Sequence, residues 1–242
     1  MKDRKTAILV AAARVIARHG VRGLRLEELA AEAGISKALV YYHFGDRAGL
    51  LRHTLRFVGE RAERAAAGGG GAGDPGAAGP LGELARRLTR DFHDLPEVRE
   101  NSAVWGELRA GAVFDPELRE ELDRADRERV REVTDLLGLL GPRAAAAPGA
   151  ALVAAAERLT VLVDGLATRR LIGILPAAHA RELMRGAIAA EAAALTAPAG
   201  PGGPAGAPAP EPYAPRLSAP AGTPAGAAMD TPSGAPISAA VI

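Results

Sequence analysis

The side chains best suited to polar contact with a partner gather in one short segment, residues 36–47. Tyr41, Tyr42 and His43 follow one another there, although the whole chain of 242 residues has only eight aromatic residues. Tyrosine hydroxyls and an imidazole can donate hydrogen bonds to phosphate oxygens, and Lys37 can reach a phosphate or the edge of a base. This combination favours contact with nucleic acid.

The pattern around these side chains predicts two short helices joined by a tight turn, over residues 25–44. This helix-turn-helix arrangement places its second helix in the major groove of DNA. Gly34 allows the positive φ that the turn needs, and Ser36 is a good N-cap for the second helix. Val40 and Phe44, one helical turn apart, are expected to face inward. An ordinary helical hairpin with surface tyrosines would show a similar pattern. The outward face is predicted to present Lys37, Ala38, Leu39, Tyr41 and Tyr42, with Arg47 at the start of the next helix, where backbone N–H groups also favour an anion.

The charge is distributed unevenly along the chain. Residues 1–64 hold 13 Lys and Arg against 7 Asp and Glu, whereas the remainder holds 17 against 22. A basic N-terminal quarter on an acidic body is typical of a protein whose first part meets a polyanion. A solvated charged surface would give the same count.

The sequence shows few patterns typical of metal binding, cofactor binding or catalysis. The chain has no Cys, which excludes disulfides and thiolate metal sites, and its five His residues do not cluster. Gly68, Gly70 and Gly73 match the spacing of a dinucleotide-binding loop, but no strand precedes them. We therefore expect no enzyme activity, no catalytic residues, no metal and no cofactor.

The rest of the chain divides by composition. We expect an all-α fold of about nine helices, with an N-terminal DNA-binding domain at residues 1–64 and a second helical domain at 81–195. A Gly-rich flexible loop is predicted at 65–80. Residues 196–242 hold 11 of the 18 prolines and are predicted to form a disordered tail. No long apolar run suggests a membrane span and the charged N-terminus does not resemble a signal peptide, so a cytoplasmic location is expected.

The second domain suggests a ligand pocket and a dimer interface. The scarce aromatic residues and a nearby cation mark the candidate pocket, whose residues are Phe92, Trp105, Arg109 and Phe114. Apolar residues at helical spacing mark the candidate interface of a homodimer, formed by Leu152, Leu159, Leu162 and Leu166 on one helix and Leu183 and Ala187 on the last. Both sets could instead be ordinary intramolecular core.

Residues 30–51, AAEAGISKALVYYHFGDRAGLL, resemble the N-terminal signature of TetR/AcrR-family transcriptional regulators. The resemblance covers residues 4–62 and includes the turn at Gly34, the aromatic end of the second helix, and Leu50-Leu51. It implies a repressor that binds a palindromic operator in double-stranded DNA as a homodimer and is released by a small-molecule effector. The segments around Trp105 and residues 164–166 resemble, over fewer residues, the BetI-type C-terminal branch.

The resemblance also implies which residues contact DNA. Two positions depart from the family pattern: Arg25 replaces the usual Thr, and Leu39 stands where Thr or another small residue is common. We expect Arg25 to contact phosphate and Leu39 to contact a thymine methyl group. The implied set is Arg25, Ser36, Lys37, Ala38, Leu39, Tyr41, Tyr42, His43 and Arg47, with backbone contact at His43 and phosphate contact at Arg47.

Two other kinds of protein remain compatible with the residues. One is a helical enzyme or ligand-binding protein with a vestigial DNA-binding head, which the lack of a catalytic constellation disfavours. The other is an architectural DNA-binding protein without a ligand, which would bind DNA with high salt sensitivity and little sequence preference. The sequence does not identify the effector, the operator or the regulated genes.

Overall fold

The computed structural model describes residues 4–68 and 79–197. These residues form ten α-helices and one 3-10 turn, and no strand, which confirms the all-α prediction. The expected count was about nine, and the structure adds the four-residue helix Pro142–Ala145. The elements are α1 (Arg4–Gly23), α2 (Leu26–Ala33), α3 (Lys37–Phe44), α4 (Arg47–Gly68), α5 (Pro80–Thr89), η1 (Arg90–Phe92), α6 (Pro96–Ala112), α7 (Pro116–Gly138), α8 (Pro142–Ala145), α9 (Gly149–Leu171) and α10 (Ala177–Thr196).

The structure describes only part of the two segments that were expected to be flexible. Residues 65–68 of the predicted loop at 65–80 instead extend α4, and residues 79–80 lead into α5. The remainder of that loop, and nearly all of the predicted tail at 196–242, lie outside the described residues. Within the described ranges, no helix is both long and apolar enough to cross a membrane.

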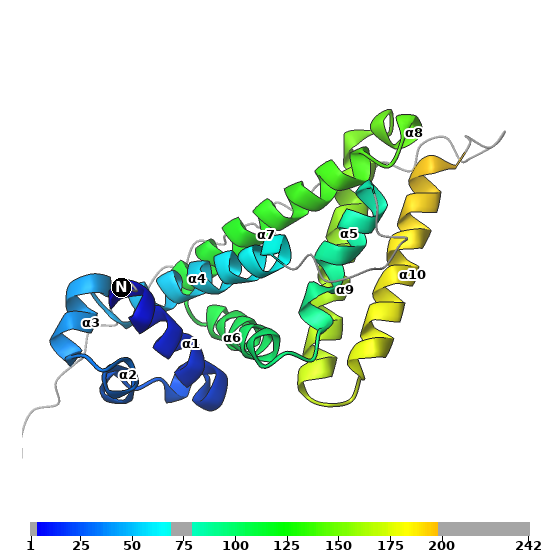
Figure 1. Ribbon diagram of the computed structural model, residues 1–242. Coiled ribbons are helices and arrows are strands. Elements are labelled where there is room, and N and C mark those ends of the chain that lie inside the picture. Colours follow the sequence, from blue (N-terminus) through cyan, green and yellow to red (C-terminus); the bar gives the residue numbers. More distant parts are fainter. Residues whose placement is uncertain (1–3, 69–78, 198–242) are drawn as a thin grey trace, which may run out of the picture. The chain divides into compact units, whose positions relative to one another are not determined.

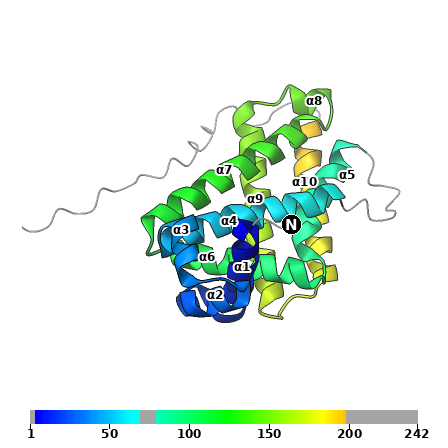
Figure 2. The ribbon, with the colours of Figure 1, turned by 60° about the vertical axis from the view of Figure 1, so that its left-hand side comes forward.

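Helices α1, α2 and α3 pack against one another and form the head of the structure (Figures 1 and 2). On α1, Ile8, Ala12, Val15 and Ile16 are fully buried, at the i, i+4, i+7, i+8 spacing of one helical face. Gly20 interrupts this helix with φ 71° and ψ 170°, a backbone conformation that is essentially restricted to glycine.

The core beneath the head is shared with later helices. Leu50 and Leu55 of α4 belong to it, but so do Val104 and Leu108 of α6 and Leu118 of α7. Helix α4 leaves the head and runs beside α7, while α6 packs across α1 (Figure 1). The division expected near residue 64 therefore does not separate two hydrophobic cores.

A second core lies between α5, α7, α9 and α10. Its members include Leu84, Phe92, Leu137, Leu159 and Met184, each at most 1% exposed. Helices α9 and α10 are joined by a short turn and run antiparallel, side by side (Figure 1). This core fixes one side of α9, and the opposite side of α9 remains exposed.

Candidate DNA interface and ligand cavity

Helix α3 is set by local interactions at both of its neighbouring turns. Gly34 ends α2 in the left-handed conformation, with φ 66° and ψ 37°, and its N–H donates back to the carbonyls of Ala30 and Ala31. Ser36 then caps α3, since its side-chain oxygen accepts a hydrogen bond from the Leu39 N–H at 3.3 Å. Both turn residues thus have the structural roles predicted for them.

Burial divides α3 into an inner and an outer face. Val40 and Phe44 are 2% and 6% exposed and join the first core. Tyr42, by contrast, is 82% exposed and Tyr41 is 46% exposed. Both aromatic side chains leave a large part of their surface open to solvent, so they are available to a partner. The outer face consists of exposed Lys37, Ala38, Tyr41 and Tyr42, with Leu39 and His43 half-buried at its edges.

Three predicted contact residues are basic, and two of them already have partners. Lys37 forms an ion pair with Glu27 of α2, and the hydrogen bond to that carboxylate raises the pKa of Lys37. Arg47 donates to the carbonyl of Val21 at the end of α1. Arg25 is exposed at the N-cap of α2 and makes no side-chain capping bond, as its chemistry requires. Arg47 thus ties the start of α4 to α1, a role that the sequence did not suggest.

A cavity of about 310 Å³ lies among α4, η1, α6, α7 and α9. Trp105 and Arg109 of α6 line it, as predicted residues of the candidate pocket. Phe92 and Phe114 do not. Phe92 is completely buried in the second core, and Phe114 is 76% exposed on the turn before α7, where the guanidinium of Arg22 lies 6.0 Å from its ring centroid. The structure therefore corrects the expectation that Phe92 and Phe114 line the same pocket as Trp105 and Arg109.

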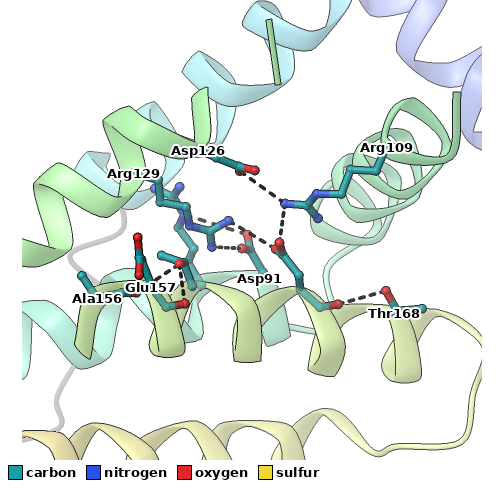
Figure 3. A network of polar contacts seen from close by, with 10 residues as sticks. Asp91, Arg109, Asp126, Arg129, Ala156, Glu157 and Thr168 are labelled. Atoms are coloured by element: carbon teal, nitrogen blue, oxygen red, sulfur yellow. Dashed lines mark hydrogen bonds and ion pairs between the residues drawn. The ribbon is translucent and has the colours of Figure 1, made fainter. Parts of the chain in front are cut away.

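A network of charged side chains spans this cavity (Figure 3). Asp164 of α9 pairs with Arg109 of α6 at 2.8 Å and with Arg129 of α7 at 3.7 Å. Arg109 also lies 3.9 Å from Asp126, and Arg129 lies 3.2 Å from Asp91. One carboxylate thus links three helices.

The electrostatics of this network are dominated by the burial of Asp164. Desolvation raises the pKa of Asp164 above the ordinary value of aspartate, although Arg109 and Arg129 both act to lower it. The guanidinium of Arg109 also lies over the Trp105 ring, 5.3 Å from its centroid. An aromatic face and two carboxylates therefore surround one cation.

Sequence reasoning missed most of this network. Asp91 lies on η1, whereas Asp126 and Arg129 lie on α7, and both segments are rich in charged residues, which are usually solvated. Their convergence depends on how η1, α7 and α9 pack, and no local spacing reports it.

A second contact missed by the sequence joins the head to α6. The Val21 N–H donates to Oε2 of Glu107 at 3.0 Å, and the Val21 carbonyl accepts from Arg47. The backbone of one residue, Val21, therefore connects α6, which lines the cavity, to α4, which follows α3.

The residues predicted for a dimer interface lie mostly within the protomer. Leu159 and Leu166 are 1% and 4% exposed in the second core, and Leu152, Leu162 and Ala187 pack half-buried against it. Leu183 is the one of these six that is exposed, at 43%. The seven-residue spacing on α9 marks packing against α5, α7 and α10.

The outward aromatic face of α3 and the cavity in the helical body define a DNA-binding transcriptional regulator of the helix-turn-helix class. Residues 8–54 match the family model of bacterial regulatory proteins of the tetR family, and residues 80–193 match that of the BetI-type transcriptional repressor C-terminal domain. A crystal structure of a TetR-family transcriptional regulator from Rhodococcus sp. is 37% identical, with a TM-score of 0.69, covering 78% of this chain and 98% of that one. The chain belongs to the TetR family of transcriptional regulators.

Two further relatives are more distant or match a shorter stretch. A transcriptional regulator from Saccharomonospora viridis, solved in complex with choline, is 23% identical with a TM-score of 0.62, covering 76% of this chain and 95% of that one, which shows a shared fold. The HTH-type transcriptional regulator BetI of Agrobacterium fabrum (strain C58) is 40% identical over 53 residues, or 22% of this chain. The chain spans 26% of the length of that curated relative.

Proposed function

We propose that this protein is a repressor that binds a palindromic operator as a homodimer and leaves it when a small molecule enters the cavity. The observation that carries the proposal is the outer face of α3, where Tyr42 is 82% exposed beside Tyr41 and Lys37. A helix of this kind fits the major groove, and two copies related by twofold symmetry read two half-sites.

In this proposal the contacts to DNA divide into two groups. Lys37, Ala38 and Leu39 near the start of α3 contact base edges, and Tyr41 and Tyr42 contact bases and backbone. The phosphate contacts come from Arg25 at the start of α2 and from Ser36 and His43 at the margins of α3, with Arg47 contributing through the donors that its bond to Val21 leaves free.

The proposed dimer forms through the exposed sides of α9 and α10. Val161 on α9 and Ile172 at the C-cap of α9 are 70% and 64% exposed, and Gly165 lies between them on the same side. On α10, Leu183 is 43% exposed and Gly186 follows one turn later. Small residues beside exposed apolar ones allow helices of two protomers to approach closely, as in a four-helix bundle.

A small-molecule effector is supported by the cavity and by the choline held in the Saccharomonospora viridis neighbour. The route from the cavity to the DNA would be α6. Arg109 of α6 lines the cavity, and Glu107 of the same helix holds the Val21 peptide of the head. A ligand that shifts α6 would bias the spacing of the two copies of α3, and DNA would weaken ligand binding by the same factor.

The test is selection of binding sites from a random DNA library at near-physiological salt, followed by titration of the selected site. Recovery of a palindrome is expected. Tyr42→Ala should weaken binding to it by about tenfold or more, since a specific contact is worth ~1–3 kcal/mol. Phe114→Ala is the matched control, because it removes another exposed ring outside α3. Recovery of DNA without sequence preference would contradict the proposal.

A further inference from the structure

The cavity is unusually polar for its size. A volume of about 310 Å³ lies at the lower end of the range for ligand pockets, roughly 300–1,000 Å³. Among the described residues, its wall carries seven carboxylates, five guanidinium groups and one aromatic ring, that of Trp105. An apolar molecule would remove water from these ions without replacing the lost hydrogen bonds. The occupant that fits this wall is small and polar.

The guanidinium of Arg109 already occupies a complete cation site inside the cavity. It lies 5.3 Å from the centroid of the Trp105 ring, 2.8 Å from Asp164 and 3.9 Å from Asp126. The Arg109 side chain is 29% exposed, so solvent reaches this position. An aromatic face with carboxylates from two other helices is what an organic cation requires.

The balance of charge favours a cation over an anion. Carboxylates outnumber guanidinium groups in the wall, and an anion would have to approach Asp91, Asp126 and Asp164 together. Burial raises the pKa of Asp164 even with two arginines beside it, so the ionised form of this carboxylate depends on a cation in contact with it. A ligand that takes the place of the Arg109 guanidinium must therefore also be a cation.

The hydrogen bonds narrow the class of cation. Arg109 approaches Asp164 to 2.8 Å through a guanidinium nitrogen that carries hydrogens. A quaternary ammonium has no N–H group, so its entry would leave the partly buried carboxylate of Asp164 without this donor. We propose that the cavity binds a small organic cation with N–H donors, an alkylguanidine, amidine or primary amine, in the place that the Arg109 guanidinium now occupies.

The inference rests on the proposed function, because it names the chemical class of the effector of that regulator. Entry of the ligand displaces Arg109 from Trp105 and Asp164 and so frees α6 from α9. Glu107 lies on α6 and holds the Val21 N–H, so the displacement reaches the head through this contact.

The experiment is isothermal titration calorimetry of the full chain, without DNA, using butylguanidinium as the probe. Butylurea, a neutral molecule of similar shape, and choline, a cation without N–H groups, are the comparison ligands.

The central variant is Arg109→Ala, which vacates the site. The tethered guanidinium competes at an effective concentration of about millimolar, so its removal should raise butylguanidinium affinity about tenfold or more. Asp126→Asn should lower the affinity, and Asp126 is exposed enough for the variant to fold.

A matched control is Arg158→Ala, which breaks a pair with Glu191 at 2.6 Å outside the cavity and should leave binding unchanged. Equal binding of butylguanidinium and butylurea, or no gain in Arg109→Ala, would overturn the inference. Equal or tighter binding of choline would overturn the requirement for N–H donors.

Titration of the selected operator is a separate experiment. If butylguanidinium binds the protein without releasing DNA, the result supports the cation site and overturns its role as the effector site. Failure to select any DNA would count against the proposed function alone, since the calorimetry needs none.

Discussion

Substitution of Gly20 by alanine should destabilise the protein through two separable effects. The φ of 71° and ψ of 170° at Gly20 lie in a region nearly closed to other residues, which costs about 1–3 kcal/mol. The added Cβ would also lie 2.6 Å from Oε2 of Glu107. The Glu107 side chain can move away, but it then leaves the Val21 N–H that it accepts from at 3.0 Å.

The second effect adds the cost of a donor without its partner, about 1–3 kcal/mol. Gly20→Ala should therefore lower the free energy of unfolding by roughly 2–6 kcal/mol, measured by urea denaturation followed by circular dichroism. In a Glu107→Ala background the carboxylate is absent, so only the backbone strain remains. The two substitutions should then show a coupling energy of about 1–3 kcal/mol.

Gly34→Ala provides the matched control for this cycle. Gly34 also has a positive φ, 66°, but no atom lies within 4 Å of the place its Cβ would take. Its substitution should cost about 1–2 kcal/mol in both backgrounds, from strain alone. The reasoning would be refuted if Gly20→Ala cost the same with and without Glu107, or no more than Gly34→Ala.

Three further predictions concern charged groups. Glu27→Gln should free Lys37 from its ion pair for the base-edge contact proposed for it and so tighten binding to the selected operator several-fold; an unchanged operator affinity would contradict this. Arg170 is 4% exposed; its Nη2 donates to the His93 carbonyl and lies 3.6 Å from the exposed Asp94, but its Nε and Nη1 have no hydrogen-bond partner. The cost of burying these two nitrogens offsets the lost contacts, so Arg170→Met should leave the free energy of unfolding nearly unchanged in urea denaturation; a loss above about 3 kcal/mol would argue otherwise. Burial raises the pKa of Asp164, so at this site the folded chain binds more protons than the unfolded chain in the acid range. The contribution to stability should then fall as pH rises through the raised pKa, and urea denaturation against pH should show this component in the parent but not in Asp164→Asn.

The local features of the head could be read from the sequence because short-range interactions determine them. Gly34 needs a positive φ, Ser36 supplies a capping oxygen, and Val40 and Phe44 repeat at one helical turn. Each of these depends on residues within four positions of one another. The outward placement of Tyr41 and Tyr42 follows directly from the inward placement of Val40 and Phe44.

The cavity could not be predicted in the same way. An aromatic residue is equally compatible with a core, a pocket and a surface, and Phe92, Trp105 and Phe114 turned out to occupy one of each. The stripe on α9 was similarly ambiguous: leucines seven residues apart, such as Leu159 and Leu166, mark a packed face without showing whether the partner is the same chain. Long-range packing decides both questions.

The sharing of the first core has a consequence for the reuse of the head in engineered sensors. Val104, Leu108 and Leu118, from α6 and α7, lie against the residues of α1 and α4. A chimera that joins residues 4–64 to the body of another regulator would expose that apolar surface unless the new body supplied side chains of matching shape. The exchangeable module of this protein is therefore larger than its helix-turn-helix, and a transplanted head must bring the inner faces of α6 and α7 with it.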